Sequence, residues 1–132
     1  MRKIVLDTNA YSRLIGGDGE VEKTLSQADK ILLPVFVIAE LLYGFKNGKK
    51  ENWNRSVLKR FENKSTVTRF YVSDETVEIF SELFLALKKK GKPIPTHDIW
   101  VAACAVETGS VLVSYDKHFL EIDKLRFWKK LT

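Results

Sequence analysis

The sequence predicts an α/β fold, in which helices cover both faces of a central, mainly parallel sheet and form a three-layer α/β/α sandwich. Short runs of aliphatic and β-branched residues, typical of buried strands, recur along the 132-residue chain, and longer segments with helical periodicity separate them. Strands separated by helices pair in parallel, because the chain crosses back over the sheet before the next strand begins. A single domain over residues 1–132 is expected, since the chain has the size of one domain and contains no linker or repeat.

The first half of the chain predicts two strands and four helices. They are a strand over 3–6, helices near 8–15 and 20–28, a strand over 30–33, a helix over 35–46 and a helix over 50–63. The helix over 35–46 is apolar nearly all round, so it is expected to be buried together with its one acid, Glu40.

The second half repeats this alternation. Its elements are a strand over 66–72, a helix from Ser73 or Asp74 to about Lys90, a helix from about His97 to Thr108, a strand over 110–114 and a short strand near 126–129. Gly91 and Gly109 are expected to end the two helices, because glycine adopts the left-handed conformation at little cost. Thr96 is expected to cap the second of them.

The chain is basic, with 22 Lys and Arg residues against 17 Asp and Glu residues, a formal net charge of +5 and a pI near 9.3. This excess suits a polyanionic partner such as RNA, and a solubilising surface explains it equally well. Which side chains bind a substrate is therefore left open. The cationic residues in question are Lys46, Lys49, Lys50, Arg55, Lys59, Arg60, Lys88, Lys89, Lys90 and Lys92.

Cysteine usage and hydropathy indicate the compartment. Cys104 is the single cysteine, so no intramolecular disulfide can form, and its apolar neighbours predict a core position. The N-terminus enters the first strand without a charged leader, and no later window reaches a membrane-spanning length. A soluble, cytoplasmic protein without membrane association is expected.

Four carboxylates in apolar settings are the functional clue. Asp7 ends the first strand and Asp116 follows the strand over 110–114, so both stand beyond the carboxyl ends of strands, where open parallel sheets bind ligands. If those strands are neighbours, the two side chains face one crevice. Asp98 lies in the first turn of its helix, and Glu40 lies inside an apolar helix. Converging carboxylates repel each other unless a cation compensates them, so the pattern predicts a divalent-metal site.

Each acid also has an ordinary structural explanation, and on single positions these explanations stay open. Asp7 suits a helix cap, Asp98 suits the positive end of a helix dipole, and Asp116 suits a turn. A buried salt bridge to Lys or Arg would explain Glu40.

The order of the motifs along the chain is more informative than any single position. Four segments, taken in sequence, resemble the PIN-domain family, in particular the toxins of VapBC toxin–antitoxin systems; they are residues 4–9, 38–44, 95–103 and 112–119. The resemblance implies a metal-dependent ribonuclease with a PIN-like fold, a cognate antitoxin as partner, and a homodimer. It also implies that the family's acidic cluster corresponds to Asp7, Glu40, Asp98 and Asp116, and its supporting polar positions to Thr8, Asn9 and Ser114.

The sequence departs from the family pattern at one position. Many members carry a further acid two residues after the fourth one, where this chain has His118. How a second metal ion would be held is therefore open.

The chemistry of this cluster follows from its oxygen ligands. Carboxylates favour Mg²⁺, with Mn²⁺ as a possible substitute, and the absence of a Cys/His spacing argues against structural zinc. In this interpretation Asp7 and Asp98 ligate the ion, Asp116 ligates the same ion or a second one, and Glu40 orients the attacking water. The supporting polar residues would hold the carboxylates in place or contact phosphate, and helix capping explains them equally well.

Two competing functions stay open. His97 and His118 would form a metal-free acid/base pair that cleaves RNA through its 2′-hydroxyl, although nothing in the sequence brings the two imidazoles together. Alternatively, the chain is a non-catalytic or phospho-acceptor domain that binds Mg²⁺, similar to a response-regulator receiver. A receiver needs an acidic pair at the end of the first strand and a lysine at the end of the last, and neither is clear here.

Overall fold

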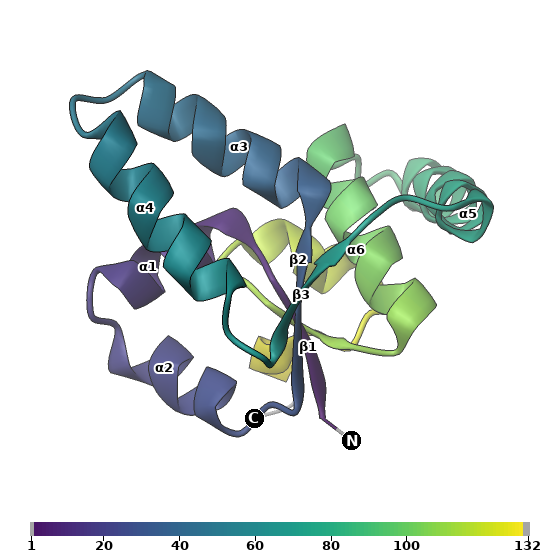
Figure 1. The fold of residues 1–132 in the computed structure, drawn as a ribbon. Coiled ribbons are helices and arrows are strands. Elements are labelled where there is room, and N and C mark those ends of the chain that lie inside the picture. The colour runs from purple at the N-terminus through teal and green to yellow at the C-terminus, as the bar shows by residue number, and fades with distance from the viewer. Residues whose placement is uncertain (1, 131–132) are drawn as a thin grey trace.

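A computed structural model describes residues 2–130 and contains a four-stranded, entirely parallel sheet. The strands are β1 (Lys3–Leu6), β2 (Lys30–Pro34), β3 (Val67–Phe70) and β4 (Val111–Val113), in the spatial order β3-β2-β1-β4. Helices lie on both sides of this sheet, as Figure 1 shows, so the predicted three-layer α/β/α fold is confirmed.

The helices within the described residues are α1 (Thr8–Ile15), α2 (Gly19–Ser26), α3 (Val35–Lys46), α4 (Glu51–Glu62), α5 (Asp74–Lys90) and α6 (Thr96–Thr108), with short 3₁₀ turns η1 (Lys117–Glu121) and η2 (Trp128–Lys130). In Figure 1, α1, α2 and α4 lie on one side of the sheet, and α6 lies on the other side with α5 outside it. Helix α3 leaves the carboxyl end of β2 and packs against α1, α4 and α6. It therefore borders the edge of the sheet at which the strands end.

The sheet forms where the sequence places its aliphatic runs, because these residues are buried on both faces. Ile4, Val5 and Leu6 of β1 are at most 1% exposed. Val5 pairs with Leu32 on one side and with Leu112 on the other. Continuous burial of this kind is typical of a central parallel strand, which explains why the run does not alternate with polar residues.

Local capping agrees with the sequence at both ends of α5 and differs at the start of α6. The Ser73 side chain caps α5, and Gly91 ends it in the left-handed conformation, as predicted. At α6 the expected cap is wrong, because Pro95 occupies the cap position and Thr96 is already the first helical residue. Proline fixes the extended backbone that a cap position requires but offers no side-chain acceptor.

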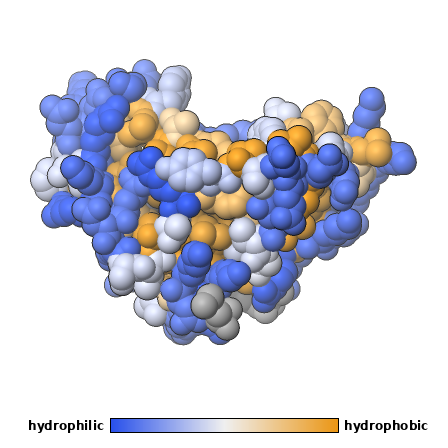
Figure 2. Space-filling model, turned by 45° about the vertical axis from the view of Figure 1, so that its right-hand side comes forward, coloured by the Kyte–Doolittle hydropathy of each residue, from blue (hydrophilic) through white to orange (hydrophobic). Residues whose placement is uncertain are grey.

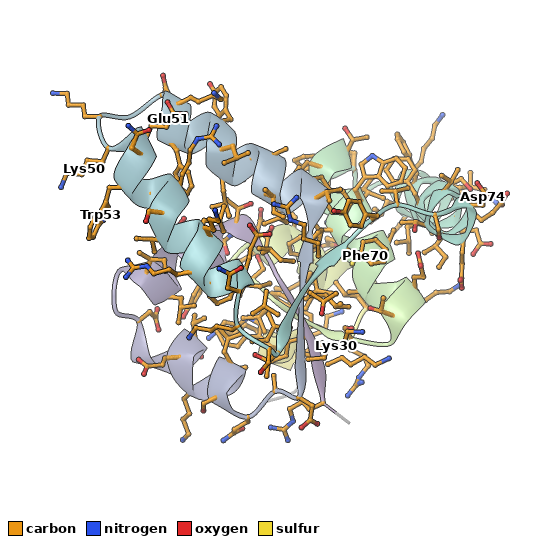
Figure 3. All side chains as sticks on the ribbon, in the orientation of Figure 1. Lys30, Lys50, Glu51, Trp53, Phe70 and Asp74 are labelled. Atoms are coloured by element: carbon orange, nitrogen blue, oxygen red, sulfur yellow. The ribbon has the colours of Figure 1, made fainter. Side chains whose placement is uncertain are left out.

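One further prediction needs correction. The last short strand, expected near 126–129, is reduced to a single bridge between Leu112 and Phe127, because η2 begins at Trp128. Trp53 is 63% exposed and therefore lies outside the core. Figure 3 shows it near Lys50 at the start of α4, pointing away from the sheet.

The predicted core position of Cys104 is confirmed. Cys104 is fully buried in α6, and burial raises the pKa of its thiol. Of the described helices, none combines the length and the apolar character that crossing a membrane requires.

Candidate functional site

The two strands that carry the first and last acids are neighbours. β1 and β4 pair in parallel, with Leu6 beside Val113, and the Asp7 amide donates a hydrogen bond to the Val113 carbonyl at 3.1 Å. Asp7 and Asp116 therefore leave the same edge of the sheet, as the sequence predicted on condition that the strands were adjacent. This edge is where ligands bind in open parallel sheets.

Ser114 joins these two segments. Its fully buried hydroxyl donates to Asp7 Oδ2 at 2.8 Å and accepts a hydrogen bond from the Asp116 amide at 3.0 Å. Asn9 supports the same junction, because its Oδ1 accepts from the Tyr115 amide at 2.9 Å. The polar residues singled out in the sequence thus hold the acids in place. The Thr8 backbone also donates a hydrogen bond to the Asp7 carboxylate. The Thr8 hydroxyl, in contrast, is buried and has no hydrogen-bond partner among the described residues.

Asp7 is a buried carboxylate, only 4% exposed. Burial raises its pKa, and hydrogen bonds from Ser114 and from the Thr8 backbone oppose that effect. The negative charge of Asp98 raises the pKa of Asp7 further. A cation between them would favour the charged form of both.

Asp98 lies in the first turn of α6 and is 8% exposed. Its two oxygens face different histidines: Oδ2 lies 3.0 Å from His118 Nδ1, and Oδ1 lies 3.8 Å from His97 Nδ1. Burial acts to raise the pKa of Asp98, but its contacts with His97 and His118 outweigh burial and hold the pKa below its ordinary value. The contact with Asp98 in turn raises the pKa of His118.

Asp98, Asp116 and His118 form the tightest group of possible ligands among the described residues. One ligand atom from each lies within 4.8 Å of the other two, and His118 Nδ1 is 3.0 Å from both Asp98 Oδ2 and Asp116 Oδ1. Asp7 is not part of this group, although Ser114 links it to Asp116. The sequence therefore placed the acids at the correct edge, while the structure adds an imidazole to them.

His118 was not among the predicted metal ligands. Asp116 caps η1, and its Oδ1 accepts a hydrogen bond from the His118 amide at 2.9 Å. This short turn folds the imidazole back onto the carboxylate two residues earlier. The spacing from Asp116 to His118 was the available signal, but His118 was interpreted as a departure from the family pattern and as one half of a metal-free acid/base pair, not as a ligand.

Glu40 differs from its prediction. It was expected to be buried, but its side chain is 45% exposed, because α3 borders the edge of the sheet and one of its faces is left uncovered. Its partner is a histidine rather than Lys or Arg, since Glu40 Oε2 lies 3.0 Å from His97 Nε2. The contact of His97 with Asp98, supported by Glu40, raises the pKa of His97 to about 9. His97 is therefore a cation at neutral pH that joins Glu40 to Asp98.

This arrangement fits a divalent cation. Two carboxylates and an imidazole converge, a third carboxylate stands beside them, and buried negative charges of this kind require a compensating positive charge. Oxygen and nitrogen donors are the ligands that such ions bind in proteins.

Comparison with known proteins agrees with this geometry. Residues 4–125 match the family model described as the PIN domain. The chain belongs to the PIN-domain family. The matched region contains all four predicted acids, so the resemblance inferred from the motifs is confirmed.

This PIN domain is similar to bacterial ribonucleases. It is 30% identical over 102 residues to ribonuclease VapC2 of Rickettsia felis, covering 76% of this chain and 75% of that one. It is also 30% identical over 116 residues to ribonuclease VapC2 of Haemophilus influenzae, covering 86% of each. Among solved structures, VapBC2 of R. felis bound to a promoter DNA fragment has a TM-score of 0.83 at 26% identity, covering 95% of this chain and 96% of that chain.

Proposed function

We propose that this PIN domain is a metal-dependent ribonuclease that hydrolyses RNA phosphodiester bonds and acts as the toxin of a toxin–antitoxin pair. The observation that carries the proposal is the group of Asp98, Asp116 and His118, with Asp7 beside it, at the carboxyl edge of the sheet. Relatives that match three quarters or more of the chain are named ribonucleases. RNA is therefore the substrate class proposed for this edge of the sheet.

The residues assigned to the cation are Asp7, Asp98 and Asp116, with Mg²⁺ as the first choice and Mn²⁺ as a substitute. When bound, such an ion supplies Lewis-acid polarisation of the phosphodiester and favours a deprotonated water. Ser114 and Asn9 hold the segments that carry Asp7 and Asp116 side by side through the hydrogen bonds described above.

Glu40 is the candidate for handling the water. Its exposed carboxylate reaches solvent while His97 holds it at 3.0 Å, so it is oriented and accessible at once. A carboxylate in this setting orients an attacking water and accepts its proton. His97, a cation at neutral pH, also offsets the negative charge that would otherwise repel a phosphate.

The partners follow from the same assignment. Several of the similar solved structures are VapBC complexes, and one relative of 26% identity is such a complex on DNA. By analogy a cognate antitoxin would inhibit this chain by setting an Arg against the carboxylates or by covering their entrance. Figure 2 shows apolar residues gathered where the surface is hollowed between two lobes, a setting suited to a protein partner. A homodimer and a cytoplasmic location belong to the same proposal.

The test compares RNA cleavage by wild type, Asp98→Asn and Asp7→Asn on a defined RNA panel, with Mg²⁺, with Mn²⁺ or with EDTA. Loss of a charge that stabilises the transition state should lower the rate on the order of 100-fold or more in both variants. Asp74→Asn is a matched control, because Asp74 is also an acid in the first turn of a helix but is exposed. It should cleave like wild type.

If Asp98 only complemented the dipole of α6, Asp98→Asn and Asp74→Asn would behave alike and the catalytic assignment would be wrong. Undiminished cleavage in EDTA would exclude a metal-dependent reaction.

One observation supports the alternative of a metal-free His97/His118 pair: both histidines contact Asp98. The same contact counts against it, because Asp98 raises the pKa of both imidazoles and so disfavours the neutral form that one of them needs as the general base. Cleavage that survives EDTA but is lost in His97→Ala would favour this alternative.

A further inference from the structure

We propose that His118 is a nitrogen ligand of the cation, and that it shifts the preference of this PIN domain from Mg²⁺ toward Mn²⁺ and other first-row transition metals. The inference rests on the proposed function, in that it assumes a cation at the group of Asp98, Asp116 and His118. It concerns which donors hold that cation and which ion they select.

The geometry supports direct ligation. His118 Nδ1 is equally distant, at 3.0 Å, from one oxygen of Asp98 and one of Asp116. An octahedral ion with ligands at about 2.1 Å holds neighbouring donors about 3 Å apart and opposite donors about 4.2 Å apart. The three donor atoms already lie within 4.8 Å of one another, so they would take an ion after small side-chain rotations.

The backbone keeps the imidazole at this position. His118 lies in η1, whose first turn is capped by Asp116, and the next residue, Phe119, is fully buried against Phe127. The His118 side chain itself is 51% exposed. A buried anchor beside an exposed ring holds Nδ1 near the two acids while leaving the ring free to turn toward an ion.

His97 does not compete for this role. Its Nε2 is engaged by Glu40 at 3.0 Å and lies 3.4 Å from the Phe36 carbonyl, and its Nδ1 is 3.8 Å from the other oxygen of Asp98. It is also absent from the group of three possible ligands. The two histidines therefore stand on different sides of Asp98, one directed to Glu40 and one to Asp116.

A nitrogen donor changes which ion binds best. Mg²⁺ strongly prefers oxygen, whereas imidazole suits first-row transition metals, whose affinity rises from Mn²⁺ toward Cu²⁺. An acid at position 118 would instead add an oxygen donor, which suits Mg²⁺. The imidazole therefore weakens Mg²⁺ binding relative to Mn²⁺.

The experiment uses the untagged full chain, because it contains only two histidines and a histidine tag would obscure them. Pulsed electron paramagnetic resonance on the Mn²⁺-loaded protein detects magnetic coupling to an imidazole nitrogen. Wild type and His97→Gln should show that coupling, whereas His118→Asp and His118→Asn should lack it. Circular dichroism confirms that each variant is folded.

Calorimetric titration with Mn²⁺ and with Mg²⁺ gives the second measurement. The ratio of Mn²⁺ to Mg²⁺ affinity should fall roughly tenfold or more from wild type to His118→Asp, a size seen when groups around a metal are altered. An unchanged ratio, or Mn²⁺ bound to wild type without nitrogen coupling, would overturn the inference and leave the proposed function standing. If wild type binds neither ion, the metal site itself is absent and the proposed function fails with it.

Discussion

Helices α3 and α6 each carry one predicted catalytic acid in an apolar sequence, yet they place those acids in opposite environments. The Asp98 side chain on α6 is 11% exposed, and the Glu40 side chain on α3 is 45% exposed. Apolar composition alone therefore does not determine whether an acid on a helix is buried. What decides it is how many sides of the helix other elements cover.

The two helices differ in what surrounds them. α6 lies between the sheet and α5, and its small residues allow close approach on both sides: Ala102, Ala103 and Cys104 are fully buried. α3 lies at the end of the sheet, where Ala39 and Tyr43 face solvent. An acid on α6 is thus suited to hold a charge out of water, and an acid on α3 is suited to exchange protons with it.

The largest expected effect tests this difference in burial. Ala103→Leu should destabilise the protein by about 1–3 kcal/mol, because extra methylene groups overpack a filled core. The matched change on α3, Ala39→Leu, should alter stability by less than about 0.5 kcal/mol, because that side chain is exposed. Urea denaturation of both variants measures the two values, and similar losses would show that α3 is covered after all.

An intermediate effect is expected at Glu40. Glu40→Gln keeps the shape of the side chain but cannot accept a proton, so cleavage should fall about 100-fold, at the low end of the usual range for general acid–base catalysis. Metal affinity should stay unchanged, because Glu40 reaches Asp98 only through His97. RNA cleavage and calorimetry on the same variant separate the two. A loss of metal affinity equal to that of Asp98→Asn would place Glu40 among the ligands instead.

The smallest effect is expected at the contact between Tyr115 and Asp18, which is partly buried and so lies between the covered α6 and the open α3. The Tyr115 hydroxyl donates to Asp18 Oδ2 at 2.9 Å, and this hydrogen bond is the main reason that the pKa of Asp18 is lowered. Burial and Asp18 raise the pKa of Tyr115 to about 12, so the phenol remains a donor at neutral and acidic pH. Tyr115→Phe should slightly lower the melting temperature at pH 7.

The sign of its pH dependence follows from the depressed pKa. Stability contributed by Asp18 is present above the pKa of the unfolded chain, near 3.8, and is lost as the pH falls through the lower folded value. The difference in melting temperature between wild type and Tyr115→Phe should therefore shrink below about pH 4. A difference that persists unchanged in acid would mean that the Tyr115 hydroxyl acts independently of the Asp18 charge, because phenylalanine keeps the ring that packs under Arg13, whose guanidinium lies 4.0 Å from the ring centre.

Much of the fold and part of the site were determined by the sequence. Uninterrupted aliphatic runs predicted the parallel strands, because a strand buried on both faces has no reason to alternate. Asp7 and Asp116 were placed at the ligand-binding edge because residues that follow parallel strands must emerge there. These are local rules, which need only the residues themselves and their spacing.

Other features were decided only by the tertiary structure. The exposure of Glu40, its pairing with His97, and the meeting of His118 with Asp98 and Asp116 each depend on elements distant in the chain. Neither periodicity nor propensity contains that information, because a side chain's burial and partners depend on what packs against it. The sequence thus determined which acids stand at the edge of the sheet, and packing decided which of them meet, which remain open to water, and which imidazole joins them.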